Sequence, residues 1–250
     1  MMILIDIGNS RTKYAQLREG QLSVTTQLNN QDFSVGYFAK HFTHASQVVV
    51  ANVAKSSLTT ELASWCSEQK ISFKQVHSEQ QKNALLSAYQ EPTSLGIDRW
   101  LALLGTIHLY PNENVLIIDA GTATTVDLLA SNGQHQGGWI LAGIKALFSS
   151  ILTHSTLVHA ENKTLPSLAF GSNTSDNVNN ACWAATLGMI EQAIEQGQVL
   201  ASIDRIILTG GDGMALTKLV LAQTSEKFIA VTNIQFIDNL IFYGLQEYCE

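Results

Sequence analysis

The chain has 250 residues, of which 46% are hydrophobic and 14% charged, a composition typical of a folded globular protein. Fourteen Lys and Arg residues stand against 21 Asp and Glu residues, so the formal net charge is -7. Nucleic-acid phosphates are bound through clustered basic residues, and this charge balance therefore argues against nucleic acid as the main partner. The length allows one large domain or two compact ones.

The cysteines and the N-terminus point to a cytoplasmic protein. Cys66, Cys182 and Cys249 are widely separated and form no CxxC pair, which suits a reducing compartment better than a disulfide framework. Asp6 interrupts the N-terminal apolar run before any signal peptide could form. No apolar run approaches the roughly 18 residues that span a bilayer. We therefore expect no membrane partner.

The hydrophobic pattern predicts strands alternating with helices along both halves of the chain, an α/β architecture with covered sheets. Each half opens with a hairpin. The elements expected after the two hairpins are strands at 47–52, 71–76, 206–208 and 227–231, and helices over 57–69, 99–108, 181–196, 214–221 and 239–248. Pro111 and Asn112 end the first half, so the expected domains are 1–112 and 113–250.

Residues 3–25 and 116–138 resemble each other. Each segment begins with an apolar run that leads into Asp-x-Gly, and each continues as a strand, a tight turn and a second strand. The residues that recur at a common offset of 113 positions are Asp6 with Asp119, Gly8 with Gly121, Thr12 with Thr125, and Gly20 with Gly133. Four coincident positions suggest two related domains.

The residues of the first Asp-x-Gly segment suit a loop that binds phosphate. Gly8 allows a sharp turn, and the short polar residues around it offer hydroxyls and backbone N–H donors to phosphate oxygens. Asp6, at the end of a buried strand, can hold a hydrated Mg²⁺. An ordinary hairpin with a capping Asp is the alternative, and the duplication favours the phosphate loop. The candidate residues are Asp6, Ile7, Gly8, Asn9, Ser10, Arg11, Thr12 and Lys13.

The second Asp-x-Gly segment is richer in hydroxyls. Thr122, Thr124 and Thr125 can bond phosphate oxygens without adding charge, and two such loops with a metal provide what phosphoryl transfer needs. Threonine is also common in strands, which explains the composition but not the paired Asp-x-Gly.

Gly96-Ile97-Asp98-Arg99 precedes an apolar helical pattern. The simplest role for Asp98 is therefore a helix N-cap. The alternative is a general base that takes the proton of an acceptor hydroxyl, with Arg99 binding an anionic group. The residues alone favour the cap.

Other motifs are weaker. The glycines of residues 209–213 would let a flat ring such as adenine approach the backbone, but a plain strand-to-helix turn has the same pattern. His41 and His44 lack acidic or Cys partners for a metal. The chain has no GxxxxGK[ST] motif, so it is not a P-loop enzyme.

In order and spacing, four segments resemble the type III pantothenate kinases over essentially the whole chain. These segments are Asp6-x-Gly-Asn-Ser, Gly96-Ile-Asp-Arg99, Asp119-x-Gly-Thr-Ala-x-Thr-x-Asp127 and Gly137-Gly-Trp-Ile140. The resemblance implies two ribonuclease-H-like domains of the acetate and sugar kinase/Hsp70/actin superfamily, with mixed sheets flanked by helices and ATP in the cleft between them. The implied reaction is ATP-dependent phosphorylation of pantothenate, the first step of coenzyme A biosynthesis.

The resemblance also implies roles for individual residues. Asp98 matches the proton acceptor, which overturns the cap-first interpretation, and residues 6–13 with Thr122 match the ATP site. Asp119 matches a ligand of a monovalent cation, potassium or ammonium. Family members are homodimers with the pantothenate site near the subunit interface. The positions that match pantothenate contacts are Tyr89, Gly96, Ile97, Asp98, Arg99 and Thr174.

The sequence departs from the family pattern at a few positions. Ser10 stands where threonine is usual and keeps the hydroxyl, Ala142 stands where proline is expected, and residues 175–178 differ beside Thr174. Two other functions share the ATP-side features: a kinase of the same superfamily for another small acceptor, and a non-catalytic actin-like ATP-binding regulator. Asp98 and Arg99 argue against the regulator, which needs no general base.

Overall fold

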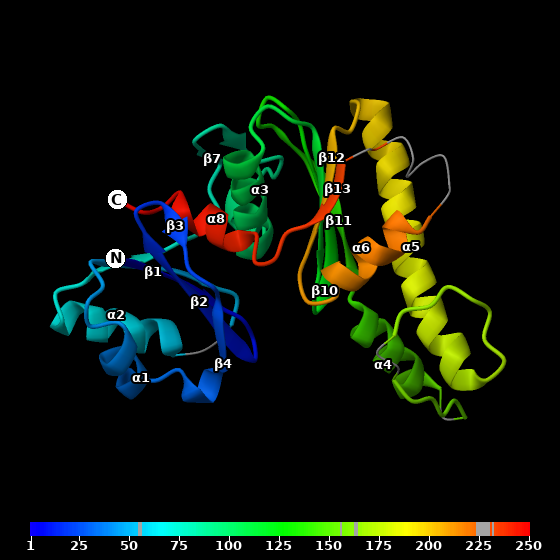
Figure 1. The fold of residues 1–250 in the computed structure, drawn as a ribbon, viewed down its shortest axis with the longest axis horizontal. Helices are drawn as coiled ribbons and strands as arrows, with labels where there is room; N and C mark the ends of the chain where they lie inside the picture. Colours follow the sequence, from blue (N-terminus) through cyan, green and yellow to red (C-terminus); the bar gives the residue numbers. More distant parts are fainter. Residues whose placement is uncertain (55–56, 156, 163–164, 224–230, 232) are drawn as a thin grey trace. The chain divides into compact units, whose positions relative to one another are not determined.

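The computed structural model describes residues 1–250 except 55–56, 156, 163–164, 224–230 and 232. The chain forms two compact units: residues 1–110 together with 239–250, and residues 111–238 (Figure 1). Among the described residues, no helix combines the length and the apolar character that a bilayer crossing requires.

The first unit is built on a mixed sheet with strand order β3-β2-β1-β5-β6, in which β4 also pairs with β2. β1 and β2 are antiparallel, whereas β5 runs parallel to β1 and β6 parallel to β5. The strands of this sheet are β1 (Met2–Ile7), β2 (Arg11–Arg18), β3 (Gln21–Leu22), β4 (Thr26–Asn29), β5 (Gln47–Asn52) and β6 (Ser72–Gln75). A separate small pair consists of β7 (Gln81–Lys82) and β8 (Leu85–Leu86).

Helices cover both faces of the first sheet. On one face, apolar residues of β1 and β5 form a core with α1 and α2. On the other, α3 and α8 pack against each other and against β5. The helical segments of this unit are α1 (Val35–His41), α2 (Leu58–Glu68), α3 (Ile97–Leu109), α8 (Ile241–Gln246) and the short 3₁₀ turns η1 (Asn30–Asp32) and η2 (Pro92–Ser94). Because both faces are covered, β1 and β5 carry continuous apolar runs.

The second unit repeats the plan of the first. Its sheet has the order β11-β10-β9-β12-β13, with an antiparallel meander β9-β10-β11 and parallel strands β12 and β13. The elements are β9 (Val115–Ala120), β10 (Ala123–Leu129), β11 (His135–Ala142), β12 (Arg205–Thr209), β13 (Asn233–Phe236), α4 (Ile144–His154), α5 (Thr174–Leu200) and α6 (Gly213–Leu221). Within this unit α5 runs along the sheet (Figure 1), and a buried apolar cluster joins β9, β10 and β12 to α4, α5 and α6. The α/β prediction with two related sheets is confirmed.

The last residues of the chain differ from the expected domain boundary. The sequence predicts domains 1–112 and 113–250, but residues 239–250 pack with the first unit. Helix α8 lies so close to α3 that a Cβ on Gly105 would meet the Leu240 carbonyl oxygen at 2.5 Å. The Trp100 indole donates to the Tyr248 hydroxyl at 2.9 Å, and this hydroxyl donates to Glu79 at 2.7 Å.

Several predicted elements match and others differ. The strand at 47–52 is confirmed with the same bounds, and the helix expected over 181–196 begins earlier, at Thr174, where Asn173 caps it by accepting from the Asp176 amide at 2.9 Å. The expected strand at 227–231 lies outside the described residues except for Val231, and a described strand, β13, follows at Asn233–Phe236. Helices α1 and α4 had no counterpart in the prediction.

Replacing Gly244 with alanine should destabilise the protein. A Cβ there would lie 2.8 Å from the Leu101 carbonyl carbon and still closer to its oxygen, so α3 and α8 would have to separate. Overpacking of this kind typically costs about 1–3 kcal/mol, enough to lower Tm by several degrees. Thermal unfolding measures the effect, with Gly188→Ala in α5 as the control, because its Cβ meets no atom within 4 Å. Equal Tm values for the two variants would contradict the close helix contact.

Candidate active site

The first Asp-x-Gly loop, which the sequence predicts to bind phosphate, joins β1 to β2. The Gly8 amide donates to the Arg11 carbonyl at 2.9 Å and closes the turn, while a Cβ on Gly8 would lie 3.0 Å from the same oxygen. Asp6 and Lys13 are direct partners across the two strands, so their side chains lie on one face of the sheet. The Lys13 ammonium donates to the Asn239 side chain at 2.9 Å. Asn9, Ser10 and Arg11 are exposed at the tip.

Thr12 points to the opposite face from Asp6 and Lys13. It is fully buried, and its hydroxyl donates to the Asn30 side-chain oxygen at 2.8 Å. Thr12 therefore contributes to the loop by holding it in place, and its side chain does not lie among the exposed polar groups. Asn30 is a residue that the sequence analysis did not single out. Its position directly after β4, next to the loop in space, depends on the pairing of β4 with β2.

The second loop joins β9 to β10 and is one residue shorter. Asp119 pairs with Thr125, and Ala120 with Thr124, whereas Asp6 pairs with Lys13 in the first hairpin. The common offset therefore holds on the first strand of each hairpin and shifts by one on the second. By register the counterpart of Thr12 is Thr124, which is also fully buried, and the expected match of Thr12 with Thr125 is wrong by one residue.

The segment that joins β11 to α4 lies against the loop of the second unit. The Gly121 amide donates to the Ala123 carbonyl at 2.9 Å, and the Gly143 amide donates to the Thr122 carbonyl at 3.0 Å. Gly143 immediately precedes α4, and a Cβ there would collide with the Gly121 carbonyl oxygen. Ala142, where the family pattern has proline, ends β11 opposite Ala123. The start of α4 therefore lies against the loop that carries exposed Thr122.

Gly210 lies directly against Asp119. It has φ +84°, and a Cβ on it would collide with the Asp119 carboxylate and lie 2.5 Å from the Ala120 carbonyl oxygen. The Asp212 amide donates to that Ala120 oxygen at 2.9 Å. Burial raises the pKa of Asp212, and the nearby Lys145 ammonium partly offsets this effect. Carboxylate and carbonyl oxygens are the ligands that suit a hard cation, so Asp119 and the neighbouring Ala120 carbonyl are the candidate ligands for the predicted monovalent cation.

The other two glycine motifs lie beside open space and beside a small cavity. Gly211 has no atom within 4 Å of an added Cβ, so space is open beside its backbone, as the adenine interpretation requires. Gly137 and Gly138 lie in β11 and line a small, mainly apolar cavity of about 120 Å³ against α5. No cluster of three His, Cys, Asp or Glu side chains that could hold a metal occurs in the described part of the chain. A divalent ion would therefore depend on single carboxylates such as Asp6 and on substrate phosphates.

Asp98 lies in the first turn of α3 and is exposed. Gly96 occupies the N-cap position, so the expectation that Asp98 caps the helix is wrong by two residues. One oxygen of Asp98 accepts from the Arg99 amide at 2.8 Å, and a Cβ on Gly96 would lie 2.6 Å from that oxygen. Glycine at this position leaves the carboxylate where Arg99 holds it.

Arg99 and Tyr89 form a pair beside Asp98. The buried Arg99 guanidinium donates to the Tyr89 hydroxyl at 2.7 Å and lies 5.7 Å from the ring centroid. The structure thus brings together Tyr89 and Gly96–Arg99, as the sequence predicts for an acceptor site. Thr174, the remaining predicted acceptor contact, is exposed at the start of α5 in the second unit.

A cavity of about 330 Å³ borders the start of α3. It lies at the carboxyl ends of the parallel strands β5 and β6, the edge at which open α/β sheets bind ligands. The Val53 amide donates to the Ile7 carbonyl at 3.1 Å, which connects the cavity wall to the strand that leads into the first phosphate loop. The lining residues are Asn52, Val53, Val76, His77, Ser78, Thr93, Ser94, Leu95, Gly96 and Ile97.

Replacing Gly96 with alanine should misplace Asp98 without unfolding the protein. The backbone at Gly96 suits any residue (φ −55°), so the added Cβ meets only the end of the Asp98 side chain, which can rotate away. Because the sequence predicts Asp98 as the proton acceptor and small displacements of such a group are costly, we expect kcat to fall about tenfold or more and Tm to stay near that of the parent. Gly36→Ala, whose Cβ has only a 3.9 Å neighbour, is the control. Unchanged kcat in Gly96→Ala would contradict the role of Gly96.

Comparisons with known proteins show which family the chain resembles. The sequence model of the type III pantothenate kinase family matches residues 2–196. A type III pantothenate kinase of Colwellia psychrerythraea is 79% identical over 248 residues, covering 99% of this chain and 100% of the relative.

Solved structures share the fold. A Campylobacter jejuni protein named as a Baf family transcriptional activator aligns with a TM-score of 0.61 at 24% identity, covering 98% of this chain and 96% of its own. A 2-dehydro-3-deoxygalactonokinase from Sinorhizobium meliloti aligns with a TM-score of 0.58 at 14% identity, covering 98% and 95%. These two likenesses concern the fold alone and extend over nearly the whole chain. On the family match and the 79% identity, the chain belongs to the type III pantothenate kinase family.

Proposed function

We propose that the chain transfers the γ-phosphoryl group of ATP to the primary hydroxyl of pantothenate, the first step of coenzyme A biosynthesis. Family membership supports the reaction, and the arrangement around Asp98 supports the acceptor side. The observation that carries the proposal is the exposed Asp98 carboxylate, which accepts from the Arg99 amide at the start of α3. Asp98 directly follows Gly96 and Ile97, which line a cavity at the carboxyl edge of the first sheet.

Asp98 is the proposed general base. One of its oxygens is held by the Arg99 amide, and the described residues offer the other oxygen no hydrogen-bond donor. That oxygen can accept the proton of the acceptor hydroxyl as the oxygen attacks the γ-phosphorus. Tyr89 and Arg99 bind the acceptor beside it, with Gly96 and Ile97 on the cavity wall.

The two Asp-x-Gly loops are the proposed ATP site. Residues 6–13 bind phosphate through backbone amides and the Lys13 ammonium, and Thr122 bonds a phosphate oxygen from the second loop. Mg²⁺ bound with ATP neutralises charge on the phosphates, and Asp6 is the carboxylate placed to hold it. Asp119 is the proposed ligand of a monovalent cation, supported by the Ala120 carbonyl oxygen, which lies beside the same glycine, Gly210, as the Asp119 carboxylate.

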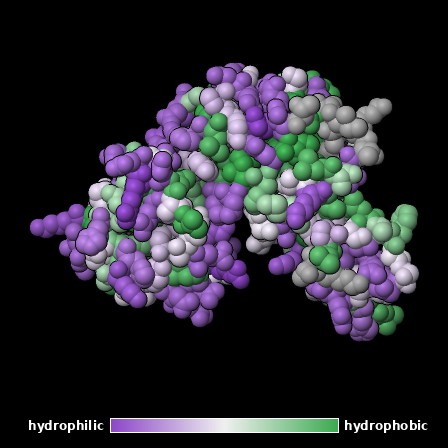
Figure 2. Space-filling model, in the orientation of Figure 1, coloured by the Kyte–Doolittle hydropathy of each residue, from purple (hydrophilic) through white to green (hydrophobic). Residues whose placement is uncertain are grey.

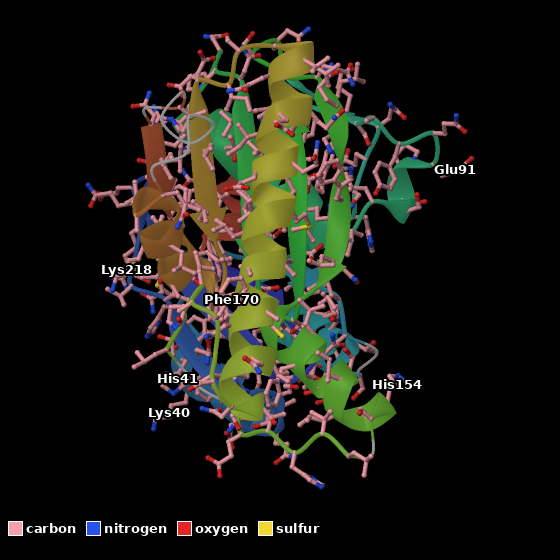
Figure 3. All side chains as sticks on the ribbon, turned by 90° about the vertical axis from the view of Figure 1, so that its right-hand side faces the viewer. Lys40, His41, Glu91, His154, Phe170 and Lys218 are labelled. Atoms are coloured by element: carbon pink, nitrogen blue, oxygen red, sulfur yellow. The ribbon has the colours of Figure 1, made fainter. Side chains whose placement is uncertain are left out.

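A homodimer is the proposed assembly, with Thr174 completing the pantothenate site near the subunit interface. Hydrophobic atoms appear on the surface of the second unit in Figure 2. Exposed apolar side chains cluster in sequence before Thr174, namely Ile151, Leu157, Leu165 and Phe170, and Phe170 lies on the loop beside α5 in Figure 3. A second copy of the chain would cover such a surface.

The free thiols of Cys66, Cys182 and Cys249 support a cytoplasmic location.

A coupled ADP-release assay with MgATP tests the function. Pantothenate should support turnover, whereas a panel of sugars and small carboxylic acids should not. Asp98→Asn should lower kcat with pantothenate by about 100-fold or more, because a general base is lost while the shape is kept. Turnover with a different acceptor would favour another kinase of this superfamily. ATP binding without turnover would favour the non-catalytic regulator, and near-normal turnover of Asp98→Asn would overturn the assignment of the base.

The same assay tests the cation site. Turnover of the parent protein should rise when sodium is replaced by potassium or ammonium, and Asp119→Asn should abolish the difference between the cations, because a neutral amide binds a cation more weakly than a carboxylate does. The measurement is kcat at matched ionic strength in each salt. If Asp119→Asn retained full potassium stimulation, Asp119 would not be the ligand.

A further inference from the structure

Asn30 cross-links the first phosphate loop. It is the first residue after β4, and the pairing of Arg11 with Asn29 brings it next to the turn between β1 and β2. The side-chain nitrogen donates to the Gly8 carbonyl at 2.8 Å, and the side-chain oxygen accepts from the Thr12 hydroxyl at 2.8 Å. The backbone amide donates to the Ser10 carbonyl at 3.1 Å. One residue therefore contacts the beginning, middle and end of the loop.

These contacts determine which backbone groups of the loop stay available. The carbonyl oxygens of Gly8 and Ser10 both accept from Asn30, and the Arg11 carbonyl accepts from the Gly8 amide. Carbonyl oxygens repel phosphate oxygens, whereas amide N–H groups attract them. With its carbonyls engaged, the loop cannot turn these oxygens toward a bound phosphate.

The second loop is held in a different way. Thr124, the register counterpart of Thr12, is fully buried, and its hydroxyl has no hydrogen-bond partner within the described residues. In the second loop, the amide of Gly143, just before α4, donates to the carbonyl of Thr122. The Asn30 arrangement is thus a feature of the first hairpin and does not follow from the duplicated motif itself.

We propose that Asn30 is a positioning residue for the triphosphate of ATP, acting by fixing the carbonyls of Gly8 and Ser10 away from the phosphates. The proposal rests on the proposed function of residues 6–13 as the first phosphate loop. Asn30 contacts neither acceptor nor reacting atoms in this role. Its effect is therefore expected on nucleotide binding and not on the affinity for pantothenate.

Asn30→Asp is the most direct test. It keeps the acceptor for Thr12 and the backbone amide but replaces the donor to the Gly8 carbonyl with a charged oxygen. We expect KM for MgATP to rise about tenfold or more, because the new carboxylate oxygen and the Gly8 carbonyl are both acceptors and the carbonyl is no longer fixed, while KM for pantothenate changes little. Asn29→Asp is the matched control, because it adds the same charge one residue away at an exposed position. Similar KM for MgATP in parent and Asn30→Asp would overturn the proposal, and so would an equal rise in Asn29→Asp.

Thr12 provides a second and milder test if Asn30→Asp folds poorly. Thr12→Val removes the hydroxyl that donates to Asn30 and should raise KM for MgATP. The effects of Thr12→Val and Asn30→Ala should be strongly non-additive in the double variant, because they break the same contact. Additive effects would count against positioning through Asn30.

Binding of a fluorescent, non-hydrolysable ATP analogue separates this proposal from the proposed function. If the parent binds the analogue and Asn30→Asp binds it at least about tenfold more weakly, Asn30 positions the nucleotide even if pantothenate is not the acceptor. If both bind equally, the role of Asn30 is refuted while the kinase assignment stands. If the parent does not bind the analogue, both fail.

Discussion

A single hydrogen bond at the end of a buried strand organises each half of this protein. In both units, the glycine of Asp-x-Gly donates its amide across the hairpin, from Gly8 to the Arg11 carbonyl and from Gly121 to the Ala123 carbonyl. The bond reverses the chain within a few residues, so the preceding aspartate stays in the sheet while the following polar residues form the loop. Because β5 and β12 run parallel to these first strands, the segments that follow them reach the same edge.

The two faces of each hairpin have separate tasks. Asp6 with Lys13, and Asp119 with Thr125, lie on one face and carry the charged or polar groups proposed for ligands. Thr12 and Thr124 lie on the opposite face and are fully buried with the helix-covered cores. Threonine therefore appears in these motifs for two reasons, and strand alternation decides which one applies. The hydroxyl of Thr12 stabilises the first loop through Asn30, whereas Thr122 is exposed at the tip of the second loop.

Much of this arrangement could be predicted from the sequence, because the duplicated hairpin and the alternation of strands and helices are local patterns. The registers of the strands in the two hairpins could not be predicted in this way. The second hairpin is one residue shorter than the first, and only the strand pairing reveals it. The return of residues 239–250 to the first unit depends on the close contact of α3 with α8, a long-range packing feature. Asn30 was missed because its partners lie 18 to 22 positions away, and no spacing rule connects them. The predicted roles of Asp98, Tyr89, Thr174 and Asp119 remain to be tested by experiment.

The central claim is that both Asp-x-Gly loops bind the phosphates of one nucleotide. Backbone hydrogen exchange, measured by mass spectrometry with and without the magnesium complex of a non-hydrolysable ATP analogue, tests it most directly. The account predicts slower exchange in peptides covering residues 6–13 and in those covering 119–125, with saturation at the same analogue concentration. Protection of only one loop, or of neither, would contradict it.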